Sequence, residues 1–460
     1  MIPARAQTLI VSTRPLADLF AAAGHRLYLV GGIVRDTILG RVLDGSDLDL
    51  TTDATPTETL ELIRGWADSI WTQGQRFGTI GAIHGDERYE ITTHRAESYQ
   101  PGSRKPEVTF SHDVETDLSR RDFTINAMAL EVTGGSPTLI DPFDGVGDLA
   151  RRQLRTPLTP EISFEDDPLR MLRAARFIAG LGLEPAPGLV DATTRTAARL
   201  EIVSAERVRD ELDKLMVVAD PTAGLWFVHD TGVSEHFLPE LGAMRLEQDP
   251  IHRHKDVLAH TIAVVSNTSP ELKVRLAALF HDVGKPRTRE VGGANGVSFH
   301  HHEVVGARMT RARMTALKYP KDLIDDVTRL VYLHLRFHTY GMGWTDSAVR
   351  RFVRDAGDLL DELIELTRCD CTTRNRRKAE MLSRRMDDLE HRIAEVGAAE
   401  ELKAMRPEID GQAVMDRLGI GPGRDVGEAM RFLLELRLEE GEIGVAEVNR
   451  RLDEWWVARR

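Results

Sequence analysis

The segment LYLVGGIVRDTILGRVLDGSDLDLTT, residues Leu27 to Thr52, governs how the rest of the chain is interpreted. It predicts an apolar strand, a glycine pair, a short helix, and a second strand that carries Asp47 and Asp49. Because side chains alternate along a strand, both carboxylates face one side, with Leu48 and Leu50 on the buried side. Two neighbouring carboxylates repel each other unless a cation lies between them, and Mg²⁺ accepts oxygen ligands that it shares with substrate phosphates. The segment therefore predicts a magnesium site that handles phosphate.

The glycine pair strengthens this interpretation. Gly31 and Gly32 lie between the strand and the helix, where bare backbone N–H groups approach a phosphate closely, and Arg35 follows at a distance suited to the same anion. Each feature alone has an ordinary explanation, since Asp-x-Asp occurs on solvated strand ends and Gly-Gly often forms a turn. Their combination in one short βαβ-like span favours a functional site.

Length and composition set limits on the rest. A chain of 460 residues predicts two to four domains. No apolar run approaches the roughly 20 residues of a membrane span, and the first 20 residues lack the apolar core of a secretory signal. With only two cysteines, Cys369 and Cys371, the chain suits a reducing cytoplasm. A net charge of −13 argues against nucleic-acid binding by the whole surface, but leaves room for a local RNA-binding patch.

Residues 77–95 predict a hairpin around Gly85 and Asp86, and Glu90 lies on its second strand. Glu90 is either a third metal-facing carboxylate or a solvated strand residue. The polar stretch 97–113 predicts a loop in which Arg104 and Lys105 reach toward a nucleotide.

Charged residues recur at spacing three further along the chain, in FEDDPLRMLRAARFIAGLGL, residues 164–183, which predicts one helix with Pro168 in its first turn. They are Asp167, Arg170, Arg173 and Arg176. A carboxylate beside a guanidinium offers an acceptor next to a donor, which matches cytosine and adenine and opposes guanine and uracil. A mismatched buried polar group costs about 1–3 kcal/mol, so such a pair selects C and A without a template. Taken alone, the pattern also fits an ordinary charged helix surface.

Six motifs follow one another between about residues 25 and 215: GGIVRD, SDLDL, RRDFTINAMA, DPFDG, DDPLRMLRAARF and RVRDEL. Together they resemble the successive motifs of the bacterial-type (class II) tRNA nucleotidyltransferases, the CCA-adding enzymes and their poly(A) polymerase relatives. The resemblance implies that Asp47 and Asp49 hold catalytic Mg²⁺. It implies that the incoming nucleotide is contacted by Gly32, Arg35 and Arg121. It further implies that Asp167 and Arg170 read the base, with Arg173 and Arg176 binding nearby. One departure is Asp166, where the family usually has Glu.

A second group of residues surrounds His281-Asp282, which ends the apolar stretch VRLAALF and precedes VGKP. With the LAHT segment before it and HHHEVVGA after it, this region resembles the HD superfamily of metal-dependent phosphohydrolases. The resemblance implies one divalent metal held by His260, His281, Asp282 and Asp370. His302 and His334 would serve a second metal, since imidazole and carboxylate suit transition metals. A degenerate HD fold that serves only as structural support is the alternative.

The resemblance implies an α+β fold, with an N-terminal polymerase-β-like nucleotidyltransferase palm followed by all-α neck, HD and tail domains. The expected domains are the catalytic head (1–154), the neck for nucleobase recognition and RNA binding (155–245), the HD domain (246–380), and a tail that docks tRNA (381–460). The expected reaction adds CTP, CTP and ATP to the tRNA 3′ end by two-metal nucleotidyl transfer without a template. The alternatives are a poly(A) polymerase, an A-adding tRNA enzyme, or an HD phosphohydrolase with a nucleotide-binding regulatory domain.

Overall fold

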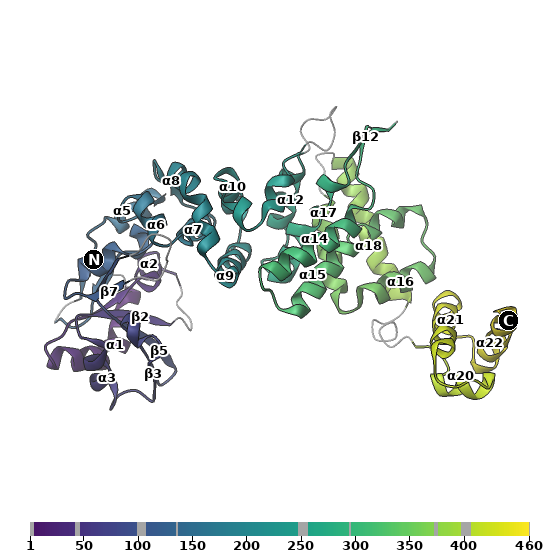
Figure 1. Cartoon of the computed structure of the whole chain (residues 1–460), viewed down its shortest axis with the longest axis horizontal. Helices are drawn as coiled ribbons and strands as arrows, with labels where there is room; N and C mark the ends of the chain where they lie inside the picture. Colours follow the sequence, from purple (N-terminus) through teal and green to yellow (C-terminus); the bar gives the residue numbers. More distant parts are fainter. Residues whose placement is uncertain are drawn as a thin grey trace. The chain divides into compact units, whose positions relative to one another are not determined.

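The computed structural model describes residues 4–41, 47–98, 107–134, 137–246, 256–293, 296–371, 376–396 and 406–459. The loop residues Arg104 and Lys105 lie outside these ranges. The chain forms two compact units, Met1–Gly242 and Ala243–Arg460 (Figure 1). The finer division of the chain into four domains stays a prediction.

Within the described ranges, no helix combines the length and the apolar character that a membrane crossing requires.

A seven-stranded mixed sheet is the centre of the first unit, with the strand order β3-β4-β5-β2-β1-β8-β9. Its strands are β1 (Leu27–Val30), β2 (Leu48–Thr52), β3 (Ser69–Trp71), β4 (Thr79–His84), β5 (Glu87–Thr93), β8 (Ala129–Glu131) and β9 (Thr138–Ile140). Two further ladders pair β6 (Arg95–Ser98) with β7 (Glu107–Phe110), and β10 (Gln153–Leu154) with β11 (Glu184–Pro185). The predicted hairpin around Gly85 is confirmed, since β4 and β5 pair antiparallel.

The segment from Leu27 to Thr52 forms a strand, a helix and a strand, but its two strands do not run in the same direction. All four residues of β1 are buried, and β2 alternates between buried Leu48 and Leu50 and exposed Asp49. However, β1 and β2 pair antiparallel, unlike the strands of a βαβ unit. Helix α2 (Gly32–Ile38) packs on β1 and on the short helix η2 (Thr124–Asn126), so the chain turns back beside β1.

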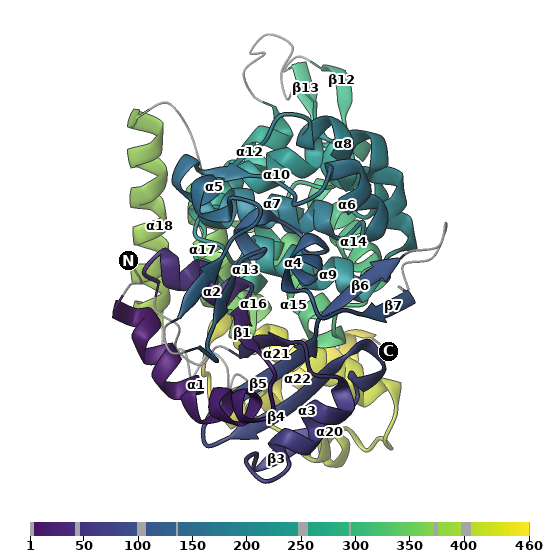
Figure 2. The same ribbon diagram turned by 90° about the vertical axis from the view of Figure 1, so that its left-hand side faces the viewer.

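The two faces of the sheet differ. Helices α1 (Ala4–Ala22) and α3 (Pro56–Ile63) pack on one face (Figure 2). Helix α3 begins with a capping box, in which the side chains of Thr55 and Glu58 accept bonds from each other's backbone N–H groups. On the opposite face, α4 (Val114–Ser119) packs on β1 and β8, so the remainder of that face, around Asp49, is left open.

The prediction of a single helix over residues 164–183 is wrong. Helix α6 (Pro160–Asp166) ends before Asp167, whose φ of −138° and ψ of 101° are extended, and α7 (Arg170–Leu181) begins after Leu169. The reason is Pro168, because proline lacks an N–H and biases the residue before it toward extended backbone. Asp167 therefore lies at a junction, off the helical ridge of Arg170, Arg173 and Arg176.

The rest of the first unit is helical. Helix α7 packs on α9 and α10, and α6 packs on α8. The elements are α5 (Gly145–Arg151), α8 (Leu189–Thr196), η3 (Ala197–Ile202), α9 (Ala205–Met216), α10 (Thr222–Asp230), η4 (Val233–His236) and α11 (Pro239–Ala243), with the short η1 (Gln75–Phe77) before β4.

The second unit is built from helices, with one small hairpin of β12 (Glu290–Gly293) and β13 (Gly296–Ser298). Helix α13 packs on α12, α15 and α17, and α14 packs on α15. The helices are α12 (Val257–Asn267), α13 (Leu272–Phe280), η5 (Lys285–Arg287), α14 (His302–Ala316), α15 (Lys321–Leu333), η6 (Arg336–Met342), α16 (Asp346–Ala356), η7 (Gly357–Leu359), α17 (Leu360–Asp370) and α18 (Arg376–Val396). The last three, α20 (Gly411–Leu418), α21 (Arg424–Glu440) and α22 (Val445–Arg459), share an apolar core centred on Val414, Leu433 and Leu452.

Candidate functional site

Three carboxylates share the open face of the central sheet. Asp49 on β2 and Glu90 on β5 are direct neighbours in the parallel register, and Asp47 precedes Asp49 by two residues. Desolvation raises the pKa of Asp49, and Glu90 and Asp47 add to this, against the lowering effect of Arg121. Burial and the neighbouring carboxylates both oppose the negative charge of Asp49, and a bound divalent cation would relieve this cost. The oxygen-only donor set fits Mg²⁺.

The β1–α2 turn brings bare backbone beside these carboxylates. Gly31 has a φ of 76°, and a Cβ there would lie 3.2 Å from Nη1 of Arg121 and 3.9 Å from Oδ2 of Asp49. Arg121 is oriented by a 3.2 Å bond from its Nη2 to Oδ2 of Asp117, which is fully buried. A glycine is therefore required at this turn both for its backbone conformation and for space.

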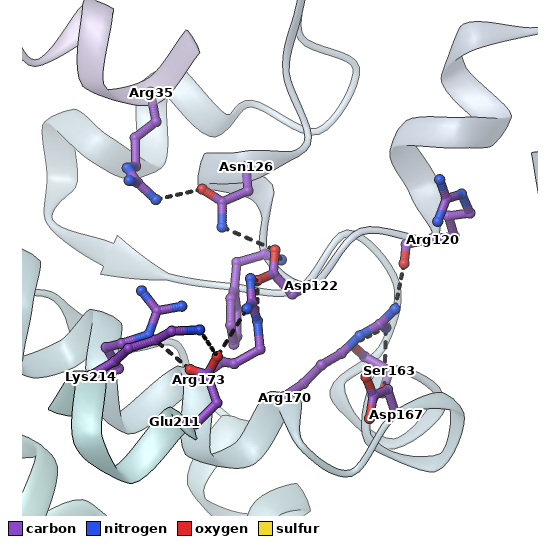
Figure 3. A network of polar contacts seen from close by, with 12 residues as sticks. Arg35, Arg120, Asp122, Asn126, Ser163, Asp167, Arg170, Arg173, Glu211 and Lys214 are labelled. Atoms are coloured by element: carbon purple, nitrogen blue, oxygen red, sulfur yellow. Dashed lines mark hydrogen bonds and ion pairs between the residues drawn. The ribbon is translucent and has the colours of Figure 1, made fainter. Parts of the chain in front are cut away.

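Arg35 belongs to a polar network that Figure 3 shows. Its Nη1 donates to Oδ1 of Asn126 at 2.7 Å, and its Nε and Nη2 donate to Asp36. Asn126 in turn donates to Oδ1 of Asp122 at 3.0 Å. At Gly32 a Cβ would lie 3.4 Å from Nη2 of Arg35, so this glycine leaves space for the guanidinium.

Asp122 links the turn between α4 and η2 to helix α7. Its Oδ2 accepts a 2.8 Å bond from Nε of Arg173, and its Oδ1 accepts from the Phe123 N–H at 2.8 Å. Burial alone would raise the pKa of Asp122, but Arg173 and Asn126 outweigh it and lower this pKa to about 2. Asp122 is therefore ionised and holds Arg173 in place.

Glu211 on α9 holds the same arginines from the other side. Its carboxylate accepts bonds from Arg176 Nε at 2.9 Å and from Lys214 Nζ at 3.2 Å, and Nη1 of Arg173 lies 3.4 Å away. Burial would raise the pKa of Glu211, but Arg176 and Arg173 keep it lowered. In the structure, Arg173 and Arg176 thus join the neck helices to each other and, through Asp122, to the turn before η2.

Asp167 and Arg170 lie close together but do not form the expected side-by-side pair. Asp167 Oδ2 accepts a 3.0 Å bond from Nη2 of Arg207 on α9. Arg170 is buried, and its guanidinium donates to Ser163 Oγ at 2.8 Å and to the Arg120 carbonyl (Figure 3). The break before Pro168 turns Asp167 toward α9, which is why its partner is Arg207.

Two adjoining hollows connect the neck residues to the sheet. Both are lined by Arg120, Asp167, Arg170 and Arg207. The larger, of about 690 Å³, extends to Glu90, and the smaller, of about 370 Å³, extends to Arg173 and Glu211. Spaces of this size accommodate small-molecule ligands such as nucleotides.

The structure also brings together the histidines and aspartates of the second unit. The ligand atoms fall into two groups, each within 4.8 Å: His260, His281 and Asp370, and Asp282, His302 and His334. Asp282 lies between the groups, since its Oδ2 is 3.2 Å from Nε2 of His281 and its Oδ1 is 3.3 Å from Nε2 of His302.

Backbone carbonyls orient three of these imidazoles in the same way. The Nδ1 atoms of His281, His302 and His334 bond to carbonyl oxygens at 2.7, 2.8 and 2.6 Å, respectively. Their Nε2 atoms are buried and make no hydrogen bond with the described residues. A carbonyl partner at Nδ1 fixes the proton there and leaves Nε2 as a ligand, which is the arrangement of metal-bound histidine. The donor set of imidazoles and carboxylates fits a divalent transition metal.

The charges of this cluster agree with that assignment. Burial would lower the pKa of His281, but Asp282 and Asp370 outweigh it and raise this pKa to about 10. Burial and the neighbouring His281 lower the pKa of His334 to about 3. The two carboxylates thus favour a positive charge at this site, and a divalent metal bound there would displace the proton of His281.

Several residues of these sites were not predicted from the sequence. Arg207 and Glu211 stand in the RVRDEL motif, but their partners 35 to 40 residues away are known only from the fold. Lys285, which follows His281-Asp282, donates to Oδ2 of Asp282 at 2.5 Å, and the VGKP sequence could have pointed to this lysine. Trp71 and Arg88, which line the larger hollow, carry no sequence signal.

Three known families match most of the chain. The "Poly A polymerase head domain" matches residues 27–155, the "Probable RNA and SrmB- binding site of polymerase A" residues 182–244, and the "HD domain" residues 229–395. Together the head and HD matches imply the use of divalent metal ions.

Curated relatives and solved structures agree. The A-adding tRNA nucleotidyltransferase of Deinococcus radiodurans is 35% identical over 362 residues, which are 76% of this chain and 81% of that protein. The CCA-adding enzyme of Limosilactobacillus fermentum is 40% identical over 48% of this chain, and this chain spans about half of its length, 54%. The CCA-adding enzyme of Bacillus stearothermophilus in complex with CTP has the same fold, with a TM-score of 0.68 at 23% identity over 97% of both chains.

The fold expected from the sequence, an α+β head followed by helical neck and HD regions, is confirmed by these matches. Since the Deinococcus relative is aligned over most of its length and the family matches follow in order, the chain belongs to the bacterial-type tRNA nucleotidyltransferases, the family of the CCA-adding and A-adding enzymes and their poly(A) polymerase relatives.

Proposed function

We propose that this protein adds CTP, CTP and ATP to the 3′ end of tRNA, in this order and without a nucleic-acid template. The observation that carries the proposal is the meeting of two features in one open region of the first unit. Asp49 and Glu90 share one row of the sheet, and the hollow lined by Glu90 continues to Asp167, Arg170 and Arg207 of the neck. A metal-binding edge and a donor–acceptor set for a base thus line one continuous space.

In the proposed mechanism, Asp47, Asp49 and Glu90 hold Mg²⁺. Bound there, Mg²⁺ would activate the RNA 3′-hydroxyl and neutralise the charge of the triphosphate. The backbone at Gly31 and Gly32 and the guanidinium of Arg121 would bind the triphosphate, because this turn leaves room for phosphate beside Asp49. Arg35 would contribute from α2, where Asn126 and Asp36 orient it.

The proposed base selection rests on groups held rigidly in the neck. Asp167 would accept the amino group of cytosine or adenine, and Arg170 would donate to the adjacent ring nitrogen. The guanidinium of Arg170 is fixed by Ser163 and by the Arg120 carbonyl. Arg207 is bonded to Asp167 and has to be counted as a third member of the set. Arg173 and Arg176 would act as positioning residues through Glu211.

Addition of A alone is the nearest alternative, because the Deinococcus relative is named an A-adding enzyme. Purified protein is incubated with tRNA transcripts that lack CCA, CA or A, and with CTP and ATP separately and together. We expect addition to all three transcripts, with ATP incorporated only after two cytidines. Addition of ATP to the CC-ending transcript only would establish the A-adding alternative, and long ATP runs on unrelated RNA would indicate a poly(A) polymerase.

Metal-dependent phosphoester hydrolysis in the second unit is a second proposed function. It is supported by the three buried Nε2 atoms that converge between Asp282 and Asp370. Its test is release of phosphate from phosphomonoesters and cyclic phosphodiesters after reloading with Mn²⁺, Co²⁺ or Ni²⁺. If the second unit binds metal but hydrolyses none of these substrates, the result would favour the alternative in which the HD fold serves only as structural support.

A cytoplasmic location belongs to the same proposal. Neither Cys369 nor Cys371 forms a disulfide, as expected of a protein that works in a reducing compartment.

A further inference from the structure

One row of residues crosses four strands of the sheet and leads away from the metal-binding edge. Asp49 on β2 pairs with Glu90 on β5, Glu90 pairs with Gly81 on β4, and Gly81 pairs with Trp71 on β3. Residues that share such a row point to the same face of a sheet. The side chain of Trp71 therefore lies on the face that carries the carboxylates.

The indole of Trp71 occupies the space directly above Gly81. A Cβ on Gly81 would overlap the Cε2, Nε1 and Cζ2 atoms of the indole, so any larger residue there would displace the ring. The glycine lets the indole lie against the backbone of β4, one strand from Glu90. Trp71 itself is only half-buried and lines the hollow of about 690 Å³.

The lining of this hollow suits a nucleic-acid strand. Apart from Asp167, Arg170 and Arg207, which are assigned to the incoming base, its charged lining residues are Arg88, Arg95, Arg120 and Glu90, in a chain whose net charge is −13. Phe77 adds a second aromatic side chain to the lining. Aromatic surface in a basic groove binds single-stranded nucleic acid by stacking, with little preference for sequence.

The chemistry of nucleotidyl transfer determines on which side the RNA approaches. Gly31 and Arg121 lie on the β1 side of Asp49, where the triphosphate is proposed to bind, whereas Glu90, Gly81 and Trp71 extend on the β5 side. Attacking and leaving oxygens are roughly in line in such a transfer. The RNA 3′-hydroxyl therefore approaches from the β5 side. The indole lies about 10 Å from Asp49, two strand spacings, which is within the reach of a terminal nucleoside.

We propose that Trp71 is the platform on which the 3′-terminal base of the acceptor RNA stacks. The proposal rests on the proposed function and assigns to it the acceptor side of the site. Stacking suits an acceptor whose last base changes with every addition, since every base has a π face. Trp71 is thus a positioning residue for the 3′-hydroxyl.

Arg88 supports this assignment. Its guanidinium carbon lies 4.8 Å from the centroid of the Trp71 ring, so a flat cation covers one face of the indole. Its ion pairs to Asp47 and Glu90 are long, 3.7 and 3.4 Å, and half of its side-chain surface is exposed. A base that displaces Arg88 from the ring leaves the guanidinium free to bind the phosphate of the same nucleotide.

The first experiment measures ATP addition to a CC-ending tRNA by the full chain. Trp71→Leu is expected to raise the KM for tRNA about tenfold or more, because stacking on an aromatic residue contributes strongly to binding of each base. The KM for ATP should stay unchanged, and Trp71→Phe should retain most of the affinity. The matched control is Trp66→Leu, since Trp66 stacks on His84 at 4.3 Å and contacts Tyr89 on the opposite face of the sheet.

The second experiment reads stacking without catalysis, in protein carrying Asp49→Asn. A tRNA with 2-aminopurine as its 3′-terminal base is titrated with protein, because stacking quenches this fluorophore. Quenching is expected with Trp71 and with Trp66→Leu, and it should be lost in Trp71→Leu and in Gly81→Ala, which displaces the indole. Equal quenching in all four proteins, or an unchanged KM for tRNA in Trp71→Leu, would overturn the platform. Quenching that depends on Trp71, together with no nucleotide addition by the protein that retains Asp49, would uphold the platform and overturn the proposed function.

Discussion

At the scale of single residues, buried carboxylates hold the arginines of the first unit in position. Asp117, Asp122 and Glu211 are each largely buried, and each accepts at least two bonds from arginine or lysine. A buried carboxylate with such partners is strongly oriented, and removal of one partner leaves an unpaired charge. The surface that is proposed to face the nucleotide is therefore rigid, because its arginines have fixed acidic partners.

Asp122 gives a pH-dependent prediction at this scale. Its pKa is lowered to about 2 in the folded protein, below the ordinary 3.8, so it stabilises the fold above pH 4 and loses this effect as pH falls toward 2. The shift corresponds to about 2 kcal/mol of stability. We expect Asp122→Asn to lower the free energy of unfolding in urea at pH 7, and this deficit to shrink between pH 4 and pH 2. Asp210→Asn, at a half-exposed ion pair, is the control and should show little deficit at any pH. A deficit that is independent of pH would contradict the assignment.

At the scale of elements, the HD cluster is assembled from separate helices. His260 lies on α12, His281 follows α13, His302 begins α14, His334 follows α15, and Asp370 ends α17. Helix ends bring the ligands together because α13 packs on α12, α15 and α17. A metal bound there would connect five helices of the second unit.

This arrangement predicts that a divalent metal stabilises the second unit. A ligand that binds only the folded state adds about 2.7 kcal/mol at 100 times its Kd, so chelation should lower the unfolding temperature and Mn²⁺ should restore it. Calorimetric titration of metal-free protein should show binding that His334→Gln weakens at least tenfold. His301→Ala is the control, because His301 is 82% exposed and lies next to His302. Equal affinity in His334→Gln and in unmodified protein would contradict the ligand assignment.

At the scale of the whole molecule, the two sites lie in separate compact units, Met1–Gly242 and Ala243–Arg460. Each site draws its ligands from one unit, so each should function when the other is disabled. We expect Asp49→Asn to abolish nucleotide addition without changing metal binding by the second unit. We expect Asp282→Asn to abolish this metal binding without changing nucleotide addition. Asp53→Asn is a control for the first unit, since Asp53 directly follows β2, at the strand end away from Asp49, and accepts a bond from the Arg26 N–H. Loss of both activities in either variant would contradict two independent sites.

The tail of the chain is predicted to dock tRNA. Between residues 406 and 459, many arginines are already in ion pairs, such as Arg437 with Glu408, Arg450 with Glu447, and Arg451 with Glu440. These pairs consume charge that a phosphate backbone would otherwise attract. The tRNA contact of the tail therefore stays a prediction.

The sequence determined much of this protein, because local patterns have local causes. Alternation placed Asp47 and Asp49 on one face, Thr55 and Glu58 set the start of α3, and ordered motifs identified the family. The tertiary structure alone decided what depends on distant partners. Pro168 broke the expected helix and turned Asp167 toward Arg207, the register of four strands aligned Trp71 with Asp49, and five helix ends joined the HD ligands. These contacts join residues that are tens of positions apart, and spacing along the chain carries no information about such pairs.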